Sequence, residues 1–178
     1  HLYHNYKNRT RGRKSPLFLP MINKEKVIAL VEERMEELNN GLYIVELSIS
    51  STNTIHVEID KINGGVTVTD CVSVSRNVEH NLDREEEDFE LHVSSAGLDK
   101  PLRHINQYVK NIGRRIETVL KDGKKIEGEL LKITDEAMFI NEQVSKQIEN
   151  KKKKMVFDEV REVNFSDVKE SKIVISFK

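Results

Sequence analysis

The sequence has few of the residues from which disulfide-rich proteins and metal sites are built. It contains one cysteine, Cys71, three prolines and no tryptophan in 178 residues. A single cysteine cannot form an intramolecular disulfide, and without a second cysteine there is neither a zinc knuckle nor a dithiol redox pair. The cysteine content therefore agrees with a reducing compartment.

Long apolar runs are also missing. No stretch approaches the roughly 18 apolar residues that a membrane-spanning helix needs. No basic segment followed by a short apolar segment marks a secretion signal. We therefore expect a cytoplasmic protein without membrane contact. The hydrophobic content of 37% is sufficient for one or two small folded domains.

Catalytic motifs are absent from the sequence as well. It has no G-x-x-x-x-G-K loop, no G-x-G-x-x-G and no H-E-x-x-H, and the pair Ser94-Ser95 lacks the glycines of a nucleophile elbow. Cys71 with His80 or His92 is the one conceivable nucleophile and base. However, Cys71 lies on the apolar stripe of a predicted helix, where cysteine behaves as a small hydrophobe. We expect no enzyme, no metal site and no cofactor.

Charge is unevenly distributed along the chain, although the formal net charge is only −1. Residues 1–20, 21–100 and 101–178 carry formal charges of +5, −10 and +4. An acidic first domain is repelled by phosphate and attracted to basic proteins, whereas a basic second domain tolerates a polyanion nearby. A particle that contains both RNA and basic proteins would offer both kinds of neighbour.

Residues 1–20 are basic and show no hydrophobic period. We interpret them as an extension, disordered or of cloning origin, that precedes a native start at Met21, and we exclude them from the predicted fold. A basic RNA-binding arm is the alternative interpretation of this segment.

Residues 21–95 have the patterning of a small α+β domain in the order helix, strand, strand, helix, strand. Asn23 and Thr69 can cap the two helices, and Gly41 is expected to end the first. Period-two alternation predicts the three strands. The apolar positions in chain order are Val27, Leu30, Val31, Met35 and Leu38; Tyr43, Val45, Leu47 and Ile49; Ile55, Val57 and Ile59; Cys71, Val74, Ser75, Val78 and Leu82; and Phe89, Leu91 and Val93.

A three-stranded sheet with both helices on one face would bury all of these stripes. This layout resembles RNA-binding modules of the KH type. None of the eight glycines, however, supplies the G-x-x-G spacing with which KH domains clamp RNA. The sequence therefore predicts a KH-like layout without KH-type RNA binding.

Residues 111–178 predict a small β-barrel of the Sm or SH3 kind. The turn at 121–124 joins two strands, Gly128 marks a sharp bend, and closure of the barrel would remove exposed edges. A short helix is expected from Pro101 to Val109, with Leu102, Ile105 and Val109 on one face. The predicted strands cover residues 116–120, 125–134, 137–140, 155–157, 160–163 and 173–177.

Residues 96–110 form the predicted junction and short helix between the two domains. The stretch Val93–Leu102 reads VSSAGLDKPL. Within it, Gly97 can take a positive φ, Asp99 can cap a helix, and Pro101 suits the first helical turn. By spacing alone, this is a strand-to-helix turn.

With its surroundings, however, the stretch resembles the V-S-S-P-G-L-D-R-P-L signature of the ribosome maturation factor RimP family. The resemblance extends from about residue 22 to residue 178. Ala96 stands where the family usually has proline, so a less rigid turn is expected, and Lys100 replaces an arginine. The further matching segments are Val57-Glu58-Ile59-Asp60, Gly64-Gly65-Val66, Asp70-Cys71, Val74-Ser75-Arg76, Leu82-Asp83 and Ile112-Gly113-Arg114.

The resemblance implies a non-catalytic factor for maturation of the small (30S) ribosomal subunit, acting as an assembly chaperone on the free precursor. The implied partners are ribosomal RNA and a basic small-subunit ribosomal protein, the latter contacted by the barrel. The junction would comprise Gly97, Leu98, Asp99, Lys100 and Pro101. Candidate ribosome contacts are Arg114, Arg115, Lys124, Lys125, Lys151, Lys152, Lys153 and Lys154.

Two points stay open at this stage. The four consecutive lysines could touch phosphates, or they could form a solvated hairpin tip. The chain could also be a general RNA-binding regulator that uses an Sm-like ring. A ring requires a stable oligomer, whereas we expect a monomer.

Overall fold

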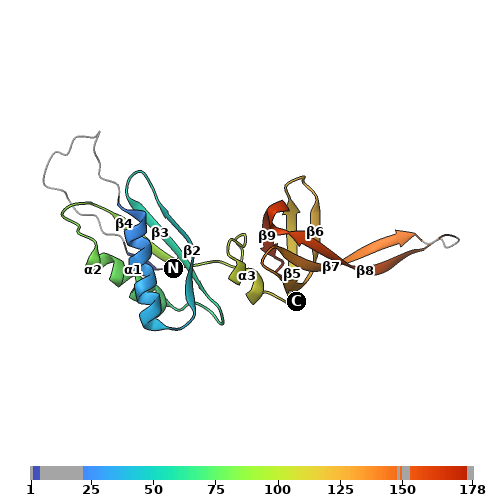
Figure 1. Ribbon diagram of the computed structural model, residues 1–178, viewed down its shortest axis with the longest axis horizontal. Helices are drawn as coiled ribbons and strands as arrows, with labels where there is room; N and C mark the ends of the chain where they lie inside the picture. Colours follow the sequence, from blue (N-terminus) through green and yellow to red (C-terminus); the bar gives the residue numbers. More distant parts are fainter. Residues whose placement is uncertain (1, 5–21, 148, 150–152, 176–178) are drawn as a thin grey trace. The chain divides into compact units, whose positions relative to one another are not determined.

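A computed structural model describes residues 2–4, 22–147, 149 and 153–175. The chain divides into two compact units, His1–Ala96 and Gly97–Lys178 (Figure 1). The first combines helices with a sheet and the second is rich in β-strands, which confirms the predicted α+β fold class. No helix in the described part of the chain is long and apolar enough to cross a membrane.

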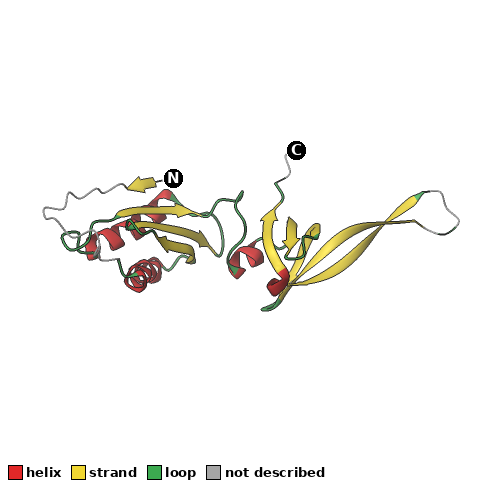
Figure 2. Ribbon diagram, turned by 90° about the horizontal axis from the view of Figure 1, so that it is seen from above, coloured by secondary structure: helices red, strands yellow, loops and turns green. Residues whose placement is uncertain are grey.

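The first unit is a four-stranded sheet with both of its helices on one face (Figure 2). The strand order is β1-β4-β3-β2. Strands β2 and β3 form an antiparallel hairpin, whereas β3 and β4 are parallel, because helix α2 crosses over between them. The elements are β1 (Leu2–His4), α1 (Lys24–Leu38), β2 (Leu42–Ile49), β3 (Thr54–Lys61), α2 (Val68–Asn81) and β4 (Glu90–Ser95).

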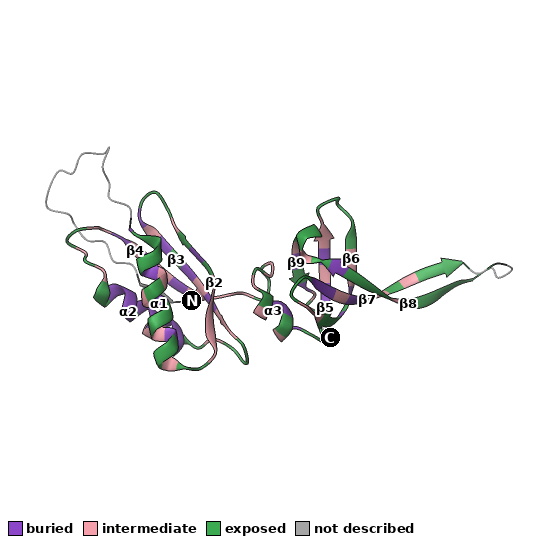
Figure 3. Cartoon of the chain, viewed as in Figure 1, coloured by how far each residue is buried: buried purple, intermediate pink, exposed green. Residues whose placement is uncertain are grey.

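The core of this unit lies between the helices and the sheet (Figure 3). On β3 and β4 the inward residues alternate as predicted, and none of them is more than 2% exposed. The buried members of the core are Ile22, Val27, Val31, Met35, Leu47, Ile55, Val57, Ile59, Cys71, Val74, Val78, Phe89, Leu91 and Val93.

Strand β2 departs from the predicted alternation. A β-bulge between Ile44 and Glu46 shifts its register against β3. Leu42 and Ile44 pack on the core before the bulge, and Leu47 and Ile49 pack on it afterwards. The prediction that Tyr43 and Val45 share a stripe with Leu47 was wrong, because the extra residue of a bulge reverses which side chains face inward.

The helix ends differ partly from the prediction. Asn23 caps α1 as expected, since its side chain accepts the backbone N–H groups of Glu25 and Lys26 at 2.9 and 3.3 Å. Helix α1 ends at Leu38, and Asn39 rather than Gly41 takes the left-handed C-cap position with φ 45°. Asparagine tolerates this conformation well.

Helix α2 is capped by Thr67 and not by Thr69. The Thr67 hydroxyl accepts the backbone N–H of Asp70, and the Asp70 carboxylate accepts that of Thr67, which makes a capping box. Lys61 also forms an ion pair with Asp70 at 2.9 Å, and the Asn40 amide donates to the same carboxylate at 2.9 Å. Burial opposes the ionisation of Asp70, but these contacts outweigh it and hold its pKa at about 2.

Strand β1 lies within the segment that was excluded from the predicted fold. Leu2–His4 pair antiparallel with β4, with Leu2 opposite Val93 and His4 opposite Leu91. These three residues therefore join the sheet, because the edge of β4 offers unpaired backbone groups that another strand can satisfy. Residues 5–21 lie outside the described part of the chain.

The second unit is a five-stranded antiparallel sheet in the order β8-β7-β6-β5-β9. Its core includes Tyr108, Ile116, Leu130, Met138, Ile140, Val163 and Ile173. The elements are α3 (Ile105–Lys110), β5 (Arg115–Leu120), β6 (Lys125–Ile133), β7 (Ala137–Gln147), β8 (Lys154–Asn164), the 3-10 turn η1 (Phe165–Asp167) and β9 (Val168–Ile173).

Full closure of the barrel is not found. The strand order is linear, and among the described residues no ladder joins β8 to β9. The chain passes from β8 to β9 through η1, whose ends are held by bonds from the Phe165 N–H to the Glu136 carbonyl and from the Lys121 N–H to the Asp167 carbonyl. Both outer strands therefore keep an edge.

Four of the predicted strands have different bounds. The separate strands at 155–157 and 160–163 form the single strand β8, and β7 continues past Ile140 to Gln147. Polar side chains fill this continuation, so its pattern does not reveal a strand. The last described strand is β9, which ends at Ile173 where the predicted strand 173–177 begins, and residues 176 and 177 lie outside the described part of the chain. The buried Ser171 of β9 is held by a 2.9 Å hydrogen bond to Thr118 instead of by apolar packing.

Gly128 leaves no room for a side chain between β6 and β7. A Cβ atom at this position would lie 2.0 Å from the carbonyl oxygen of Asn141. We expect Gly128→Ala to lower the free energy of unfolding of the second unit by about 1–3 kcal/mol, because backbone would have to move. Gly65→Ala is the matched control, since a Cβ there meets nothing within 4 Å. Urea unfolding followed by circular dichroism measures both, and equal stabilities would contradict the prediction.

The pKa of Asp70 makes the stability of the first unit sensitive to acid. Because this pKa lies below the ordinary 3.8, the ionised carboxylate stabilises the fold above about pH 4, and the contribution is lost as the pH falls toward 2. The shift corresponds to about 2 kcal/mol. Urea unfolding at several pH values between about 5 and 2 measures this loss of stability. We expect it to be missing in Asp70→Asn. The control Glu33→Gln, on the exposed side of α1, should lose stability as the wild type does. Parallel curves for wild type and Asp70→Asn would refute the assignment.

Candidate functional site

The junction residues Gly97–Pro101 lie between two backbone hydrogen bonds. The Ala96 N–H donates to the Ile59 carbonyl at 2.9 Å, which closes the end of β4 against β3. The Leu102 N–H donates to the Ser171 carbonyl at 2.8 Å, which ties the chain to β9. Each bond lies within its own unit, so the signature stretch begins and ends at a fixed point of the fold.

The Ala96 bond changes the expectation drawn from the missing proline. A proline has no N–H and could not donate to the Ile59 carbonyl. The expected loosening of the turn is therefore offset by a hydrogen bond that only a non-proline residue can make.

Gly97 and Asp99 do not have the roles predicted for them. Gly97 is not among the glycines with positive φ. A Cβ at Gly97 would instead lie 2.5 Å from the Oδ1 atom of Asp99, so glycine leaves room for that carboxylate to fold back over the turn. The Lys100 N–H donates to the Gly97 carbonyl at 3.2 Å and completes the turn. Leu98 is 58% exposed.

Helix α3 begins at Ile105 and is capped by His104, so Asp99 is not its cap. The Gln107 side chain accepts the N–H groups of Arg103 and His104 at 2.7 and 3.1 Å, and this holds the chain extended up to that point. Local side-chain hydrogen bonds therefore set the start of the helix later than Pro101 indicated.

The buried face of α3 is also not the predicted one. Tyr108 is buried and meets Phe165 edge-on, with ring centroids 5.1 Å apart. Ile105 and Val109 are 40% and 48% exposed. Leu102 does pack on the core of the second unit, but it precedes the helix and so does not share a helical face with them.

The basic residues predicted on the barrel fall into two places on the surface. Arg115 opens β5 and pairs with Glu127 at 2.8 Å, next to the exposed Arg114. Lys125 lies at the opposite end of the β5–β6 hairpin and pairs with Glu117 at 3.1 Å. The structure therefore brings Lys124 and Lys125 together and separates them from the two arginines. Arg115 and Lys125 are already partly neutralised by carboxylates on the neighbouring strand.

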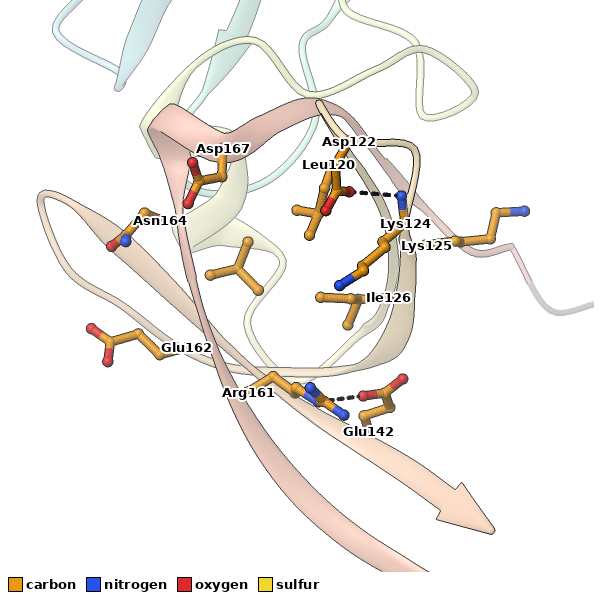
Figure 4. A pocket seen from close by; sticks show the side chains of 11 residues that line it. Leu120, Asp122, Lys124, Lys125, Ile126, Glu142, Arg161, Glu162, Asn164 and Asp167 are labelled. Atoms are coloured by element: carbon orange, nitrogen blue, oxygen red, sulfur yellow. Dashed lines mark hydrogen bonds and ion pairs between the residues drawn. The ribbon is translucent and has the colours of Figure 1, made fainter.

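A pocket of about 420 Å³ opens beside Lys124 and Lys125 (Figure 4). Apolar side chains from β5, β6 and β8 contribute to its lining, and charged side chains gather around it. Arg161 is held by Glu142 at 2.7 Å. The lining residues are Leu120, Asp122, Lys124, Lys125, Ile126, Glu142, Arg161, Glu162, Val163, Asn164 and Asp167.

The charges of this pocket favour a positively charged guest. Lys125 and Arg161 are each paired with a carboxylate. The remaining charged residues of the lining are one cation, Lys124, and three acidic residues, Asp122, Glu162 and Asp167. A phosphate would meet more negative than positive charge there. A lysine or arginine side chain, with an apolar stem and a cationic head, fits both the apolar lining and the carboxylates.

A second acidic surface was missed by the sequence analysis. Because Ile55, Val57 and Ile59 face the core, the residues between them face the other side of the sheet. His56 and His92 stack there with centroids 4.8 Å apart. Among the described strand residues, no lysine or arginine shares this outer face. Its acidic members are Glu46, Glu58, Asp60 and Glu90. Reading the polar positions of the alternating strands would have revealed it.

No cluster of three or more His, Cys, Asp or Glu side chains in the described ranges could hold a metal ion. Burial and the negative charge of Asp70 raise the pKa of the Cys71 thiol, which disfavours a nucleophilic thiolate. Lys151 and Lys152 lie outside the described residues, whereas Lys153 and Lys154 are exposed at the end of β8.

The fold and these surfaces define a two-domain α+β protein whose second domain is a small Sm-like barrel. A family model described as the RimP N-terminal domain matches residues 30–99. The ribosome maturation factor RimP of Christiangramia forsetii is 41% identical over 154 residues, covering 86% of this chain and 99% of that protein. The protein of the same name from Flavobacterium psychrophilum is 36% identical over 159 residues, covering 88% and 100%. The one from Cytophaga hutchinsonii is 30% identical over 165 residues, covering 87% and 95%.

The chain therefore belongs to the RimP family, as its junction signature predicted.

The burial of Cys71 can be tested by thiol titration. In native buffer near pH 8 we expect a thiol reagent to label Cys71 at least about tenfold more slowly than in denaturant, because the thiol is 7% exposed and its pKa is raised. Stopped-flow absorbance measures both rates. Complete labelling of the native protein at the denatured rate would show an exposed thiol and would reopen the possibility of Cys71 chemistry.

Proposed function

We propose that this protein is a maturation factor of the small (30S) ribosomal subunit that binds the free precursor particle without catalysing a reaction. The observation that carries the proposal is the 41% identity to a ribosome maturation factor, which spans both units and 99% of that protein. The proposal includes that the protein is cytoplasmic and monomeric and needs no cofactor.

The surfaces support two kinds of partner on the precursor. The pocket of the barrel suits a basic ribosomal protein, because its lining holds more carboxylates than free cations, and the outer sheet face of the first unit adds the acidic residues Glu46, Glu58, Asp60 and Glu90. The exposed cations of the barrel away from this pocket, Arg114, Lys153 and Lys154, suit ribosomal RNA. Residues Gly97–Pro101 join the two units, so that one protein molecule carries both surfaces to the precursor particle.

The proposed mechanism needs no chemical step. A factor that binds one precursor conformation more tightly than others raises the population of that conformation by the ratio of the affinities. Contacts to RNA and to a basic protein at once would favour precursors in which both are correctly placed. The protein then leaves when the mature particle no longer presents that arrangement.

A general RNA-binding regulator with an Sm-like ring is the second candidate. The observation that favours it is the linear order of the second sheet, because the free edges of β8 and β9 could pair between copies. Such a ring would be a stable oligomer that binds unstructured RNA with a steep dependence on salt. A monomer in analytical ultracentrifugation rules this candidate out.

Sedimentation with purified ribosomal particles tests the proposed function. We expect co-migration with free small subunits, and not with large subunits or joined ribosomes, at both low and moderate salt. Asp167→Asn should weaken this binding about threefold to tenfold by removing a carboxylate from the pocket, whereas the exposed Asp135→Asn should not. Equal binding to all particles that disappears with salt would mean a non-specific basic protein and would end the proposal.

A further inference from the structure

Strands β7 and β8 continue far beyond the rest of their sheet. The last pair between β6 and β7 is Gly128 with Glu142, whereas β7 and β8 stay paired as far as Gln147 with Lys154. Residues 143–147 and 154–158 therefore form a two-stranded ribbon, here called the arm. At about 3.3 Å per residue the arm extends about 17 Å, and Figures 1 and 2 show it running away from the other strands of the second unit.

The arm exposes apolar side chains on both of its faces. Directly paired residues share a face, so Phe157 with Val144 and Met155 with Lys146 lie on one side. Val156, opposite Ser145, lies on the other side. Met155, Val156 and Phe157 are 43%, 63% and 38% exposed. None of them contributes to the core of the barrel, and three consecutive exposed apolar residues on an isolated ribbon indicate a contact surface.

Charge separates along the arm. At its base, Arg161 contacts both Glu142 and Glu159, and Lys146 pairs with Glu159, so these charges largely neutralise one another. At its outer end, Lys153 and Lys154 are exposed and have no ion-pair partner among the described residues. The end of the arm is therefore positive, and it favours a polyanion over a basic protein.

We propose that the arm inserts into a groove or junction of folded RNA, with Lys153 and Lys154 on phosphates and Phe157 against a base or ribose. A ribbon that lies on a flat protein surface needs only one apolar face, whereas this arm has apolar residues on both, as contact with two walls requires. Folded RNA offers such walls, since unstacked bases at loops and bulges stack on aromatic side chains between flanking phosphates. The inference rests on the proposed function for the origin of the RNA.

Binding to a fluorescent RNA hairpin with an internal loop tests the arm directly. By anisotropy at several salt concentrations, Lys153→Gln/Lys154→Gln should weaken binding about tenfold and reduce the slope of log Kd against log salt by about 2, one unit per phosphate contact. Phe157→Ala should also weaken binding about tenfold but leave the slope unchanged, because it removes stacking and no charge. The matched control is Lys169→Gln/Lys172→Gln on β9, which should bind as wild type does.

Thermal unfolding should give the same Tm for all these variants, since the arm lies outside the core. Wild-type RNA binding by both arm variants would overturn the inference. If the arm variants bound the RNA hairpin as the wild type does but no longer bound small subunits, the arm would contact a ribosomal protein and the proposed function would stand. If the wild type bound no small subunits but the variants lost RNA binding as expected, the proposed function would fail and the RNA-binding arm would stand.

Discussion

The parallel pairing of β3 with β4 is the constraint on which the rest of the structure depends. Parallel neighbours require a crossover, and α2 supplies it while covering the face that carries Ile55 and Leu91. The same ladder decides where the first unit ends, because its last bond runs from the Ala96 N–H to the Ile59 carbonyl. The junction Gly97–Pro101 therefore begins immediately after the last hydrogen bond of the β3–β4 ladder.

Sequence patterns predicted those parts of the fold whose side chains are sorted by burial. The stripes of both long helices and the alternation on β3 and β4 are of this kind, and they form the core of the first unit, with the exception of Leu38 in the last turn of α1. The bulge in β2 was not predictable, because an inserted residue leaves no composition signal. The start of α3 escaped for a different reason: it depends on the Gln107 side chain accepting two backbone N–H groups. The β7 half of the arm escaped because its mostly polar residues show no period, whereas the β8 half includes the predicted strand 155–157.

The candidate site was predictable in its residue types and less so in its geometry. The signature predicted the junction, but the role of Gly97 depends on the Asp99 carboxylate folding back on it, which follows from the three-dimensional structure and not from the sequence. The lysines of the β5–β6 turn are exposed, and their predicted contact with the ribosome stays a prediction. Their neighbours Glu162 and Asp167 come from a distant part of the chain, and this changes the expected partner of the pocket from phosphate to a cationic side chain.

Under the proposed function, these surfaces act together because a short stretch, Gly97–Pro101, links the two units. Once one unit is bound, the second contact becomes intramolecular, and its effective concentration depends on the span of the link. Several surfaces of modest affinity can then give tight binding to a particle that presents RNA and a basic protein at the right separation. A particle that presents only one of them is bound weakly. Discrimination between precursor conformations would arise in this way from geometry, without any catalytic group.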